Sequence, residues 1–314
     1  MLVFKGLHTL DREFEYPVVT IGNFDGVHLG HQKIFRRVIE AARGRGTSMV
    51  LTFDPHPLKV IAPDRRLKLL TPLDEKIRLI EMTGMDVLVC IEFDREFAKM
   101  DPEDFVRGVL VERLGVRHVI VGHDYRFGRG KRGTTDLLRR RGRKYGFRVN
   151  VVRSRRMSGH PVSSSRIRQL LAWGRVCEAA TLLGRPYSIH GRVITGAGRG
   201  AGILGIPTAN IETPNELAPR EGVYAVKVKI GNTLYDGVAN IGRNPTFGGG
   251  ALSYETHLFG FDGDLLGEEI RLYFIDRIRG ERTFPGPEAL RREIDKDIET
   301  AKLILKEHRV DVYP

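Results

Sequence analysis

His28 and His31 flank Gly30 in a short motif that could handle phosphates. The motif follows an apolar run at 18–21 that is typical of a strand, and apolar residues at helical spacing come after it. Both imidazoles therefore belong to a strand-to-helix turn, where free N–H groups and the helix dipole favour an anion. Two imidazoles there can stabilise a phosphoryl group during transfer. The alternative is a pair of turn histidines that bind no ligand.

Two more segments of the first half favour anions. Asp124 and Arg126 lie in the segment 122–128, where a carboxylate could hold a ribose hydroxyl and a guanidinium could hold a phosphate. The alternative there is an ordinary polar loop. The segment 163–168 offers serine hydroxyls, free N–H groups and an arginine at a helix start, although simple N-capping by serine needs no ligand.

The first half alternates predicted strands with predicted helices, which indicates an α/β fold with a doubly wound parallel sheet covered on both faces. Ligands of such sheets bind beyond the carboxyl ends of the strands, where the histidine motif and the segment 122–128 both fall. We expect strands at 18–21, 49–53, 87–91, 119–122 and 147–152, and helices near 32–42, 73–82, 102–114 and 134–145.

The character of the chain changes near Gly184, which predicts two domains, 1–184 and 185–314. Two short helices, at 164–173 and 176–183, close the first domain. The second domain is rich in glycine and predicts an antiparallel β-barrel, with a sandwich as the alternative, followed by an amphipathic C-terminal helix. We expect its strands at 188–194, 223–230, 233–240, 252–260 and 269–274, and an apolar helix stripe of Leu290, Ile294, Ile298, Ala301 and Leu305.

Composition describes an ordinary globular protein of 314 residues, with 41% hydrophobic and 29% charged residues. No apolar run is long enough to cross a membrane. Cys90 and Cys177 are too few for a disulfide framework or a zinc cluster, so we expect a cytoplasmic protein whose cysteines pack as small apolar residues.

The net charge of +12 is concentrated in the basic runs 139–144 and 153–156. Such runs can attract the phosphates of nucleotides or RNA, or they can form a solvated helix face and an exposed loop. No aromatic stacking pattern accompanies them, so the sequence does not favour nucleic acid as a partner. The oligomeric state cannot be inferred from these patterns.

Three motifs of the first half together resemble the nucleotidyltransferase module of the bacterial bifunctional riboflavin kinase/FAD synthetase family. They are Gly-x-Phe-Asp-Gly-x-His-x-Gly-His-Gln at 22–32, Gly-x-Asp-aromatic-x-Phe-Gly at 122–128 and Ser-Ser-Ser-x-x-Arg at 163–168. The resemblance implies transfer of AMP from ATP to the phosphate of FMN, giving FAD and pyrophosphate. It implies that His28 and His31 contact the ATP phosphates and stabilise the transition state. It implies nucleotide binding by Gly22, Asn23, Phe24, Asp25, Gly26, Gly30, Asp124, Arg126, Ser164, Ser165 (usually threonine in the family) and Arg168.

The second half carries a glycine-rich run at 196–205 that ends in Pro-Thr-Ala-Asn at 207–210. Glycine-rich loops can bring backbone N–H groups close to phosphates, although a flexible hairpin is the simpler explanation. Thr208 and Asn210 alternate along an extended segment, so both oxygens can face one side and share a hard cation such as Mg²⁺.

This run resembles the riboflavin kinase module of the same family, as do Asn-x-Gly-x-x-Pro-Thr-Phe at 240–247 and Glu-x-His at 255–257. The resemblance implies that Glu255 is the general base for the ribityl 5′-hydroxyl. It implies ATP binding by Gly198, Arg199, Gly200 and Gly205. The chain departs from the family at Gly202, where many members carry a basic residue.

The leading hypothesis is one chain with two sequential, Mg²⁺-dependent activities: riboflavin and ATP give FMN, and FMN and ATP give FAD. A second enzyme hypothesis keeps the histidine turn but takes a phosphocholine-like or pantetheine phosphate as the acceptor. A third hypothesis, motivated by the charge of +12, is an RNA-binding protein with steeply salt-dependent binding.

Overall fold

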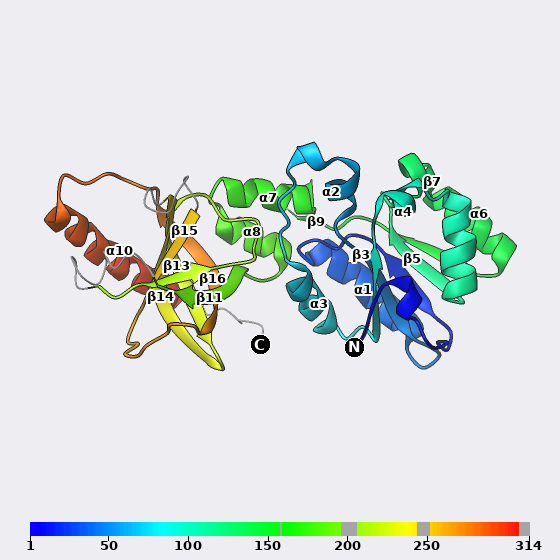
Figure 1. Ribbon diagram of the computed structural model, residues 1–314, viewed down its shortest axis with the longest axis horizontal. Coiled ribbons are helices and arrows are strands. Elements are labelled where there is room, and N and C mark those ends of the chain that lie inside the picture. The colour runs from blue at the N-terminus through cyan, green and yellow to red at the C-terminus, as the bar shows by residue number, and fades with distance from the viewer. Residues whose placement is uncertain (158, 196–205, 244–251, 308–314) are drawn as a thin grey trace. The chain divides into compact units, whose positions relative to one another are not determined.

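Six parallel strands form the centre of the first half in the computed structural model, which describes residues 1–157, 159–195, 206–243 and 252–307. The sheet order is β1-β4-β3-β2-β5-β8. Figure 1 labels β3 and β5 of this sheet. Its strands are β1 (Leu2–Lys5), β2 (Val18–Ile21), β3 (Ser48–Asp54), β4 (Val87–Glu92), β5 (His118–Gly122) and β8 (Arg148–Val152). The five predicted strands are confirmed, and β1 is an additional edge strand that pairs with β4.

Helices cover both faces of this sheet because apolar side chains alternate along its strands. Val18 and Val50 lie in one core with α1 (Leu29–Ala42) and α3 (Leu73–Glu81). Val19 and Met49 lie in the other core, which includes side chains of η3 (Phe105–Arg113) and α6 (Thr135–Tyr145). The doubly wound α/β fold is therefore confirmed.

The remaining elements of this half are short. They are η1 (Leu7–Thr9), α2 (Pro57–Ile61), η2 (Pro63–Arg65), α4 (Arg95–Lys99), α5 (Pro102–Asp104), β6 (Arg126–Phe127), η4 (Arg129–Lys131), β7 (Gly133–Thr134), β9 (Arg156–Met157) and β10 (His160–Pro161). The single helix expected at 102–114 consists of α5 followed by a π-helical segment, η3, in which the Leu114 N–H donates to the Val109 carbonyl.

The strand order places a topological switch point beside β2. β2 pairs with β3 on one side and with β5 on the other, so the chain reverses its direction of travel across the sheet there. In open α/β sheets the ligand crevice lies outside the carboxyl ends of the strands at such a point. The histidine motif follows β2 and the segment 122–128 follows β5, so both reach this edge.

The chain divides into two compact units, Met1–Ser163 and Ser164–Pro314. The second unit begins with α7 (Ser164–Ala172) and α8 (Val176–Leu183). Both helices contact the rest of that unit. The Leu171 carbonyl of α7 accepts from the N–H of Arg220, just before β13 (2.9 Å), and the Cys177 thiol of α8 donates to the Ile275 carbonyl of β16 (3.0 Å). The division therefore falls before α7, whereas the predicted functional boundary falls after α8 and stays a prediction.

The second unit contains a closed antiparallel barrel in the order β11-β12-β15-β14-β13-β16. All of these strands except β12 are labelled in Figure 1. Its strands are β11 (Tyr187–Ile194), β12 (Ala209–Glu212), β13 (Gly222–Ile230), β14 (Thr233–Arg243), β15 (Leu252–Leu258) and β16 (Glu269–Arg279). The predicted barrel is confirmed.

The C-terminal helix α10 (Pro287–Glu307) docks on the barrel through part of the predicted stripe. Ala301 and Leu305 are buried against Val223 and Val238 of β13 and β14. The Asp297 carboxylate adds a bidentate ion pair with Arg279 of β16 (2.7 and 2.9 Å). Both side chains are largely buried, so this pair fixes the helix to the barrel.

Candidate functional site

The turn that joins β2 to α1 is tight and strained. Phe24 and Val27 both have left-handed backbone angles (φ 49° and 41°), and Gly26 between them has φ 83°. Positive φ at a β-branched residue such as Val27 is a genuine outlier, with a cost of about 1–3 kcal/mol. The surrounding structure must therefore hold this turn in place.

Asp25 supplies one of these restraints. Its side chain is 4% exposed, and its carboxylate accepts from the backbone N–H groups of Leu70 (2.9 Å) and Thr71 (3.2 Å). In return, the Thr71 hydroxyl accepts from the Gly26 N–H (3.2 Å). These contacts clamp the turn to the segment before α3. Asp25 thus shapes the loop, while its predicted contact with nucleotide stays a prediction.

His28 and His31 lie at the N-terminus of α1, where the sequence predicted them. The His28 side chain caps the helix, because its Nδ1 accepts from the His31 N–H (3.3 Å). The two rings stack with centroids 3.6 Å apart and 19° between their planes. With Nδ1 as the acceptor, the proton of neutral His28 is on Nε2, which can donate to an anion.

Gly30 permits this stacking. A Cβ at position 30 would lie 3.0 Å from Cε1 of His28, closer than nine in ten real Cβ contacts, so the imidazole would have to shift. On the other side, the edge of Phe24 meets the His31 ring at 5.2 Å between centroids, and Phe24 also packs on Phe35 in the core. Three features therefore set the position of the imidazole pair: the cap at the start of α1, the absence of a side chain at Gly30 and the contact of the Phe24 ring with His31.

The segment after β5 lies at the edge of the sheet with polar side chains in solvent. The side chain of Asp124 is 84% exposed, and Arg126 is exposed on β6. Tyr125 and Phe127 alternate with these two polar residues along the chain, and their rings stack with centroids 5.5 Å apart. Both predicted binding residues are available to a ligand, and the aromatic residues anchor the segment.

Ser164, Ser165 and Arg168 occupy the first turns of α7. Ser165 is exposed, whereas Ser164 and Arg168 are half-buried. This helix belongs to the second unit, so a joint site of these residues with the histidine turn stays a prediction.

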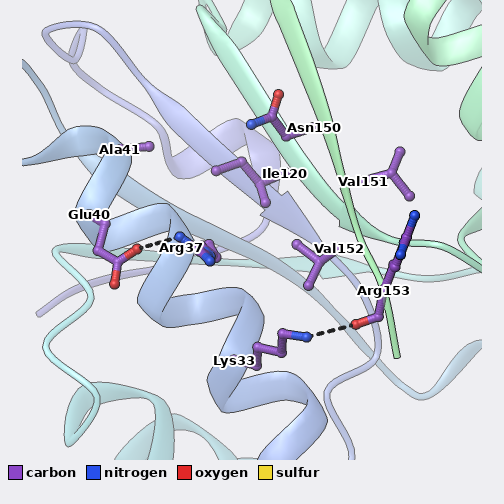
Figure 2. Close-up of a pocket in the computed structure, with 9 residues that line it drawn as sticks. All are labelled: Lys33, Arg37, Glu40, Ala41, Ile120, Asn150, Val151, Val152 and Arg153. Atoms are coloured by element: carbon purple, nitrogen blue, oxygen red, sulfur yellow. Dashed lines mark hydrogen bonds and ion pairs between the residues drawn. The ribbon is translucent and has the colours of Figure 1, made fainter. Parts of the chain in front are cut away.

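A pocket lined by charged and apolar side chains lies between α1 and β8 in the first unit (Figure 2). Its volume is about 600 Å³, and its lining combines Lys33, Arg37 and Arg153 with apolar side chains of β5 and β8. The Lys33 ammonium donates to the Arg153 carbonyl (3.2 Å), and Arg37 pairs with Glu40 (3.2 Å) (Figure 2). Sequence reasoning assigned no role to Lys33 or Arg37, although their spacing of four places both cations on one face of a helix.

In the barrel, three polar residues form a row across adjacent strands. Glu255 of β15 lies opposite Asn210 of β12 and opposite Asn240 of β14. All three are half-buried, and paired positions have Cβ atoms about 4.5–5.5 Å apart. Because side chains alternate along a strand, Asn240 is on the same face as Val238, which packs under α10. Asn240 begins the motif at 240–247, but the sequence assigned it no role, and the strand register is what sets it opposite Glu255.

Thr208 directly precedes β12, two residues before Asn210. The His257 ring fixes this approach, because its Nδ1 lies 2.9 Å from the Pro207 carbonyl oxygen. Thr208, Asn210 and Glu255 offer hydroxyl, amide and carboxylate oxygens, the hard donors that suit Mg²⁺. The described residues include no cluster of three His, Cys, Asp or Glu side chains that could hold a metal ion. The predicted ATP-binding residues Gly198, Arg199, Gly200 and Gly205, and also Gly202, lie outside the described residues.

Neither cysteine has the environment of a nucleophile. Burial raises the pKa of the Cys90 thiol, and burial together with Asp276 raises the pKa of Cys177 to about 11. Both thiols are therefore protonated at neutral pH, which agrees with a packing role.

Family models match both halves of the chain: FAD synthetase over residues 11–166 and riboflavin kinase over residues 183–305. The bifunctional riboflavin kinase/FMN adenylyltransferase of Escherichia coli is 39% identical over 305 residues, which cover 96% of this chain and 97% of that protein. The protein of the same name from Haemophilus influenzae is 38% identical over 304 residues, which cover 96% and 98%.

A solved structure with a different name has the same fold. The crystal structure of a macrolide-efflux protein from Streptococcus pneumoniae superposes with a TM-score of 0.87 at 30% identity, covering 96% of this chain and 99% of that one. In the described part of this chain, no helix is long and apolar enough to cross a membrane. Both family models concern flavins, which disfavours the phosphocholine-like and pantetheine acceptors considered above. By the two domain models and the near full-length relatives, the chain belongs to the bifunctional riboflavin kinase/FMN adenylyltransferase family, with its FAD synthetase domain ahead of its riboflavin kinase domain.

Proposed function

We propose that the histidine turn is the adenylyl-transfer site of this enzyme and that the row at Glu255 is its kinase site. The observation that carries the first assignment is the stacked pair of His28 and His31 at the start of α1, beside the switch point of the sheet. The observation that supports the second is the register that sets Glu255 opposite Asn210.

In adenylyl transfer, an oxygen of the FMN phosphate attacks the α-phosphorus of ATP. A bond to that oxygen forms, the bond to pyrophosphate breaks, and FAD results. The attacking phosphate is already ionised near neutral pH, so the site must align two anions and neutralise them rather than supply a strong base. His28 donates from Nε2 toward the phosphates, His31 adds a second imidazole, and the N-terminus of α1 contributes its partial positive charge.

In the kinase reaction, the nucleophile is an alcohol and needs a base. Glu255 takes the proton of the ribityl 5′-hydroxyl as its oxygen attacks the γ-phosphorus of ATP, and ADP leaves. Thr208 and Asn210 hold Mg²⁺, which neutralises phosphate charge when it is bound. Asn240, across from Glu255, orients the carboxylate or the substrate hydroxyl.

The remaining predicted residues complete the two sites. Asp124 and Arg126 bind the nucleotide at the edge of the sheet. Ser164, Ser165 and Arg168 of α7 are further nucleotide-binding residues by their match to the family motif. Gly22, Asn23, Phe24, Asp25, Gly26 and Gly30 shape the phosphate turn. The adenylyltransferase domain runs from 1 to 184 and the kinase domain from 185 to 314. A cytoplasmic location agrees with the use of ATP and with the two free cysteines, Cys90 and Cys177.

Product analysis tests this proposal directly. The purified chain is incubated with riboflavin, ATP and Mg²⁺, and the flavins are separated by chromatography. We expect FMN to appear first and FAD to follow, and FAD to form from added FMN without riboflavin. Folded protein that forms neither product would contradict both assignments, and omission of Mg²⁺ should stop both steps.

A further inference from the structure

Lys76 is a buried cation at the carboxyl edge of the sheet, and neither reaction described above uses it. It lies on α3, and its side chain is 8% exposed. Its ammonium donates to the Thr52 hydroxyl (3.1 Å), to the Phe53 carbonyl (3.3 Å) and to the Asn23 carbonyl (3.5 Å). An ammonium has three N–H donors, so three oxygen acceptors match its whole capacity.

These acceptors come from the ends of two neighbouring strands. Thr52 and Phe53 lie near the end of β3, and Asn23 lies in the turn that leads from β2 to His28. The Thr52 hydroxyl also donates to the Asn23 carbonyl (3.2 Å), which closes a small network around that one oxygen. Lys76 therefore ties the first residue of the strained turn to the adjacent strand, while Asp25 ties the next part of the turn to the segment before α3.

The Lys76 ammonium is a buried charge, and its burial is costly. Burial lowers the pKa of the Lys76 ammonium, and nearby Cys90, Asp25 and Asp54 act in the opposite direction. A buried charge is costly unless its hydrogen bonds are made, so a shift of the turn that lost the Asn23 contact would carry a penalty. The ammonium thus favours one position of the turn.

We propose that Lys76 is a positioning residue for adenylyl transfer, which fixes the Asn23 carbonyl and so sets where His28 and His31 meet the phosphates. This inference rests on the proposed role of the histidine turn. Lys76 touches no reacting atom, and its effect passes through the turn. Its substitution should therefore change turnover more than substrate affinity.

The test compares K76M, which has a similar length but no charge, with K76R, which keeps the charge, and with K99M. The last variant removes an exposed lysine of the same unit. We expect K76M to lower kcat for FAD formation from FMN by about 10–100-fold, because misplacement by an ångström can cost that much. KM for ATP should change by less than about threefold, K76R should recover part of the loss, and K99M should match the unmodified enzyme.

FMN formation by the second unit is an internal control in every sample. It should be unchanged in K76M, and thermal unfolding should show that the variant is folded. A folded K76M with normal kcat for FAD formation would overturn the proposal. If the unmodified enzyme makes no FAD, the proposed function itself fails, which is a distinct result.

The pH dependence of FAD formation tests the role of Lys76 even if K76M does not fold. Because the pKa of Lys76 is lowered, we expect the rate of FAD formation to fall at an alkaline pH that lies below the usual lysine pKa of 10.5. The charged or titratable groups whose charges act on Lys76 include Cys90, Asp25 and Asp54. The Cys90 thiol itself loses its proton at alkaline pH, so C90A serves as the control. The same decline in C90A supports the proposal, whereas a rate that stays level up to pH 10.5 overturns it.

Discussion

Glu255 lies directly opposite Asn210 in the β12–β15 ladder, so the proposed base and a proposed Mg²⁺ ligand share one level of the barrel. E255Q keeps the shape of the side chain but cannot accept the proton of the ribityl hydroxyl. We expect FMN formation to fall by about 10²–10⁴-fold, as is usual for a lost general base. FAD formation from added FMN should be unchanged, and chromatography of both reactions checks this. Equal loss of both activities would contradict separate sites.

His28 caps α1 and is also the proposed donor to the phosphates, and two variants separate these roles. H28A removes the cap, at a cost of about 1 kcal/mol of stability, whereas asparagine in H28N is a favourable N-cap. Both lack the imidazole, so both should lower kcat for FAD formation by about 10²–10³-fold, the range for one lost charge-stabilising donor. FMN formation should continue. If H28N restored FAD formation, the imidazole would be a structural cap only.

The ion pair of Arg279 with Asp297 predicts a stability effect confined to the second unit. Its side chains are 12% and 6% exposed, so D297A would leave the guanidinium buried without its main partner. Breaking such a pair from one side costs about 3–5 kcal/mol. Calorimetry should show a lower unfolding temperature for the barrel, and FAD formation from added FMN should be retained. Asp295 is exposed on the same helix, and D295A is the matched control.

His118 predicts a loss of stability in acid. Burial lowers its pKa from the usual 6.5, with Arg148 and Arg45 acting in the same direction and a hydrogen bond with Asn150 acting against them. Its Nε2 is buried and has no hydrogen-bond partner among the described residues. The unfolded chain therefore binds a proton first as pH falls, so the free energy of unfolding decreases between pH 6.5 and the lowered pKa.

Urea unfolding of the first unit at pH 7.5 and at pH 5 measures this effect, with H118N as the comparison. The histidine contribution should be complete above pH 6.5 and should diminish below it. H118N should lose less stability than the unmodified protein over the same interval. Identical pH dependence in both proteins would exclude His118 as the cause.

Sequence periodicity predicted most of the elements because their apolar patterns are long or repeated. β2 and α8 begin and end where they were expected. β1 was not predicted, because four residues with a single buried side chain carry too little pattern, and pairing with β4 creates this strand. The break between α5 and η3 was also missed, because a change in backbone hydrogen bonding leaves the apolar spacing almost unaltered.

The motifs located the candidate site, but its supporting contacts depend on tertiary structure. His28, His31 and Glu255 stand out by type and spacing. Lys76 does not, since a lysine in an amphipathic helix is ordinarily exposed, and only the packing of α3 buries it. Asn240 likewise gains its relation to Glu255 from the barrel register, which relates residues fifteen positions apart in the chain.

The strained turn at 24–27 has a consequence for protein engineering. Its geometry depends on Leu70, Thr71 and Lys76, which come more than forty residues later in the chain. The eleven-residue motif 22–32 is therefore not portable: grafted alone into another parallel sheet, it would relax to ordinary backbone angles and separate its rings. A transplant would have to carry the distant anchors as well.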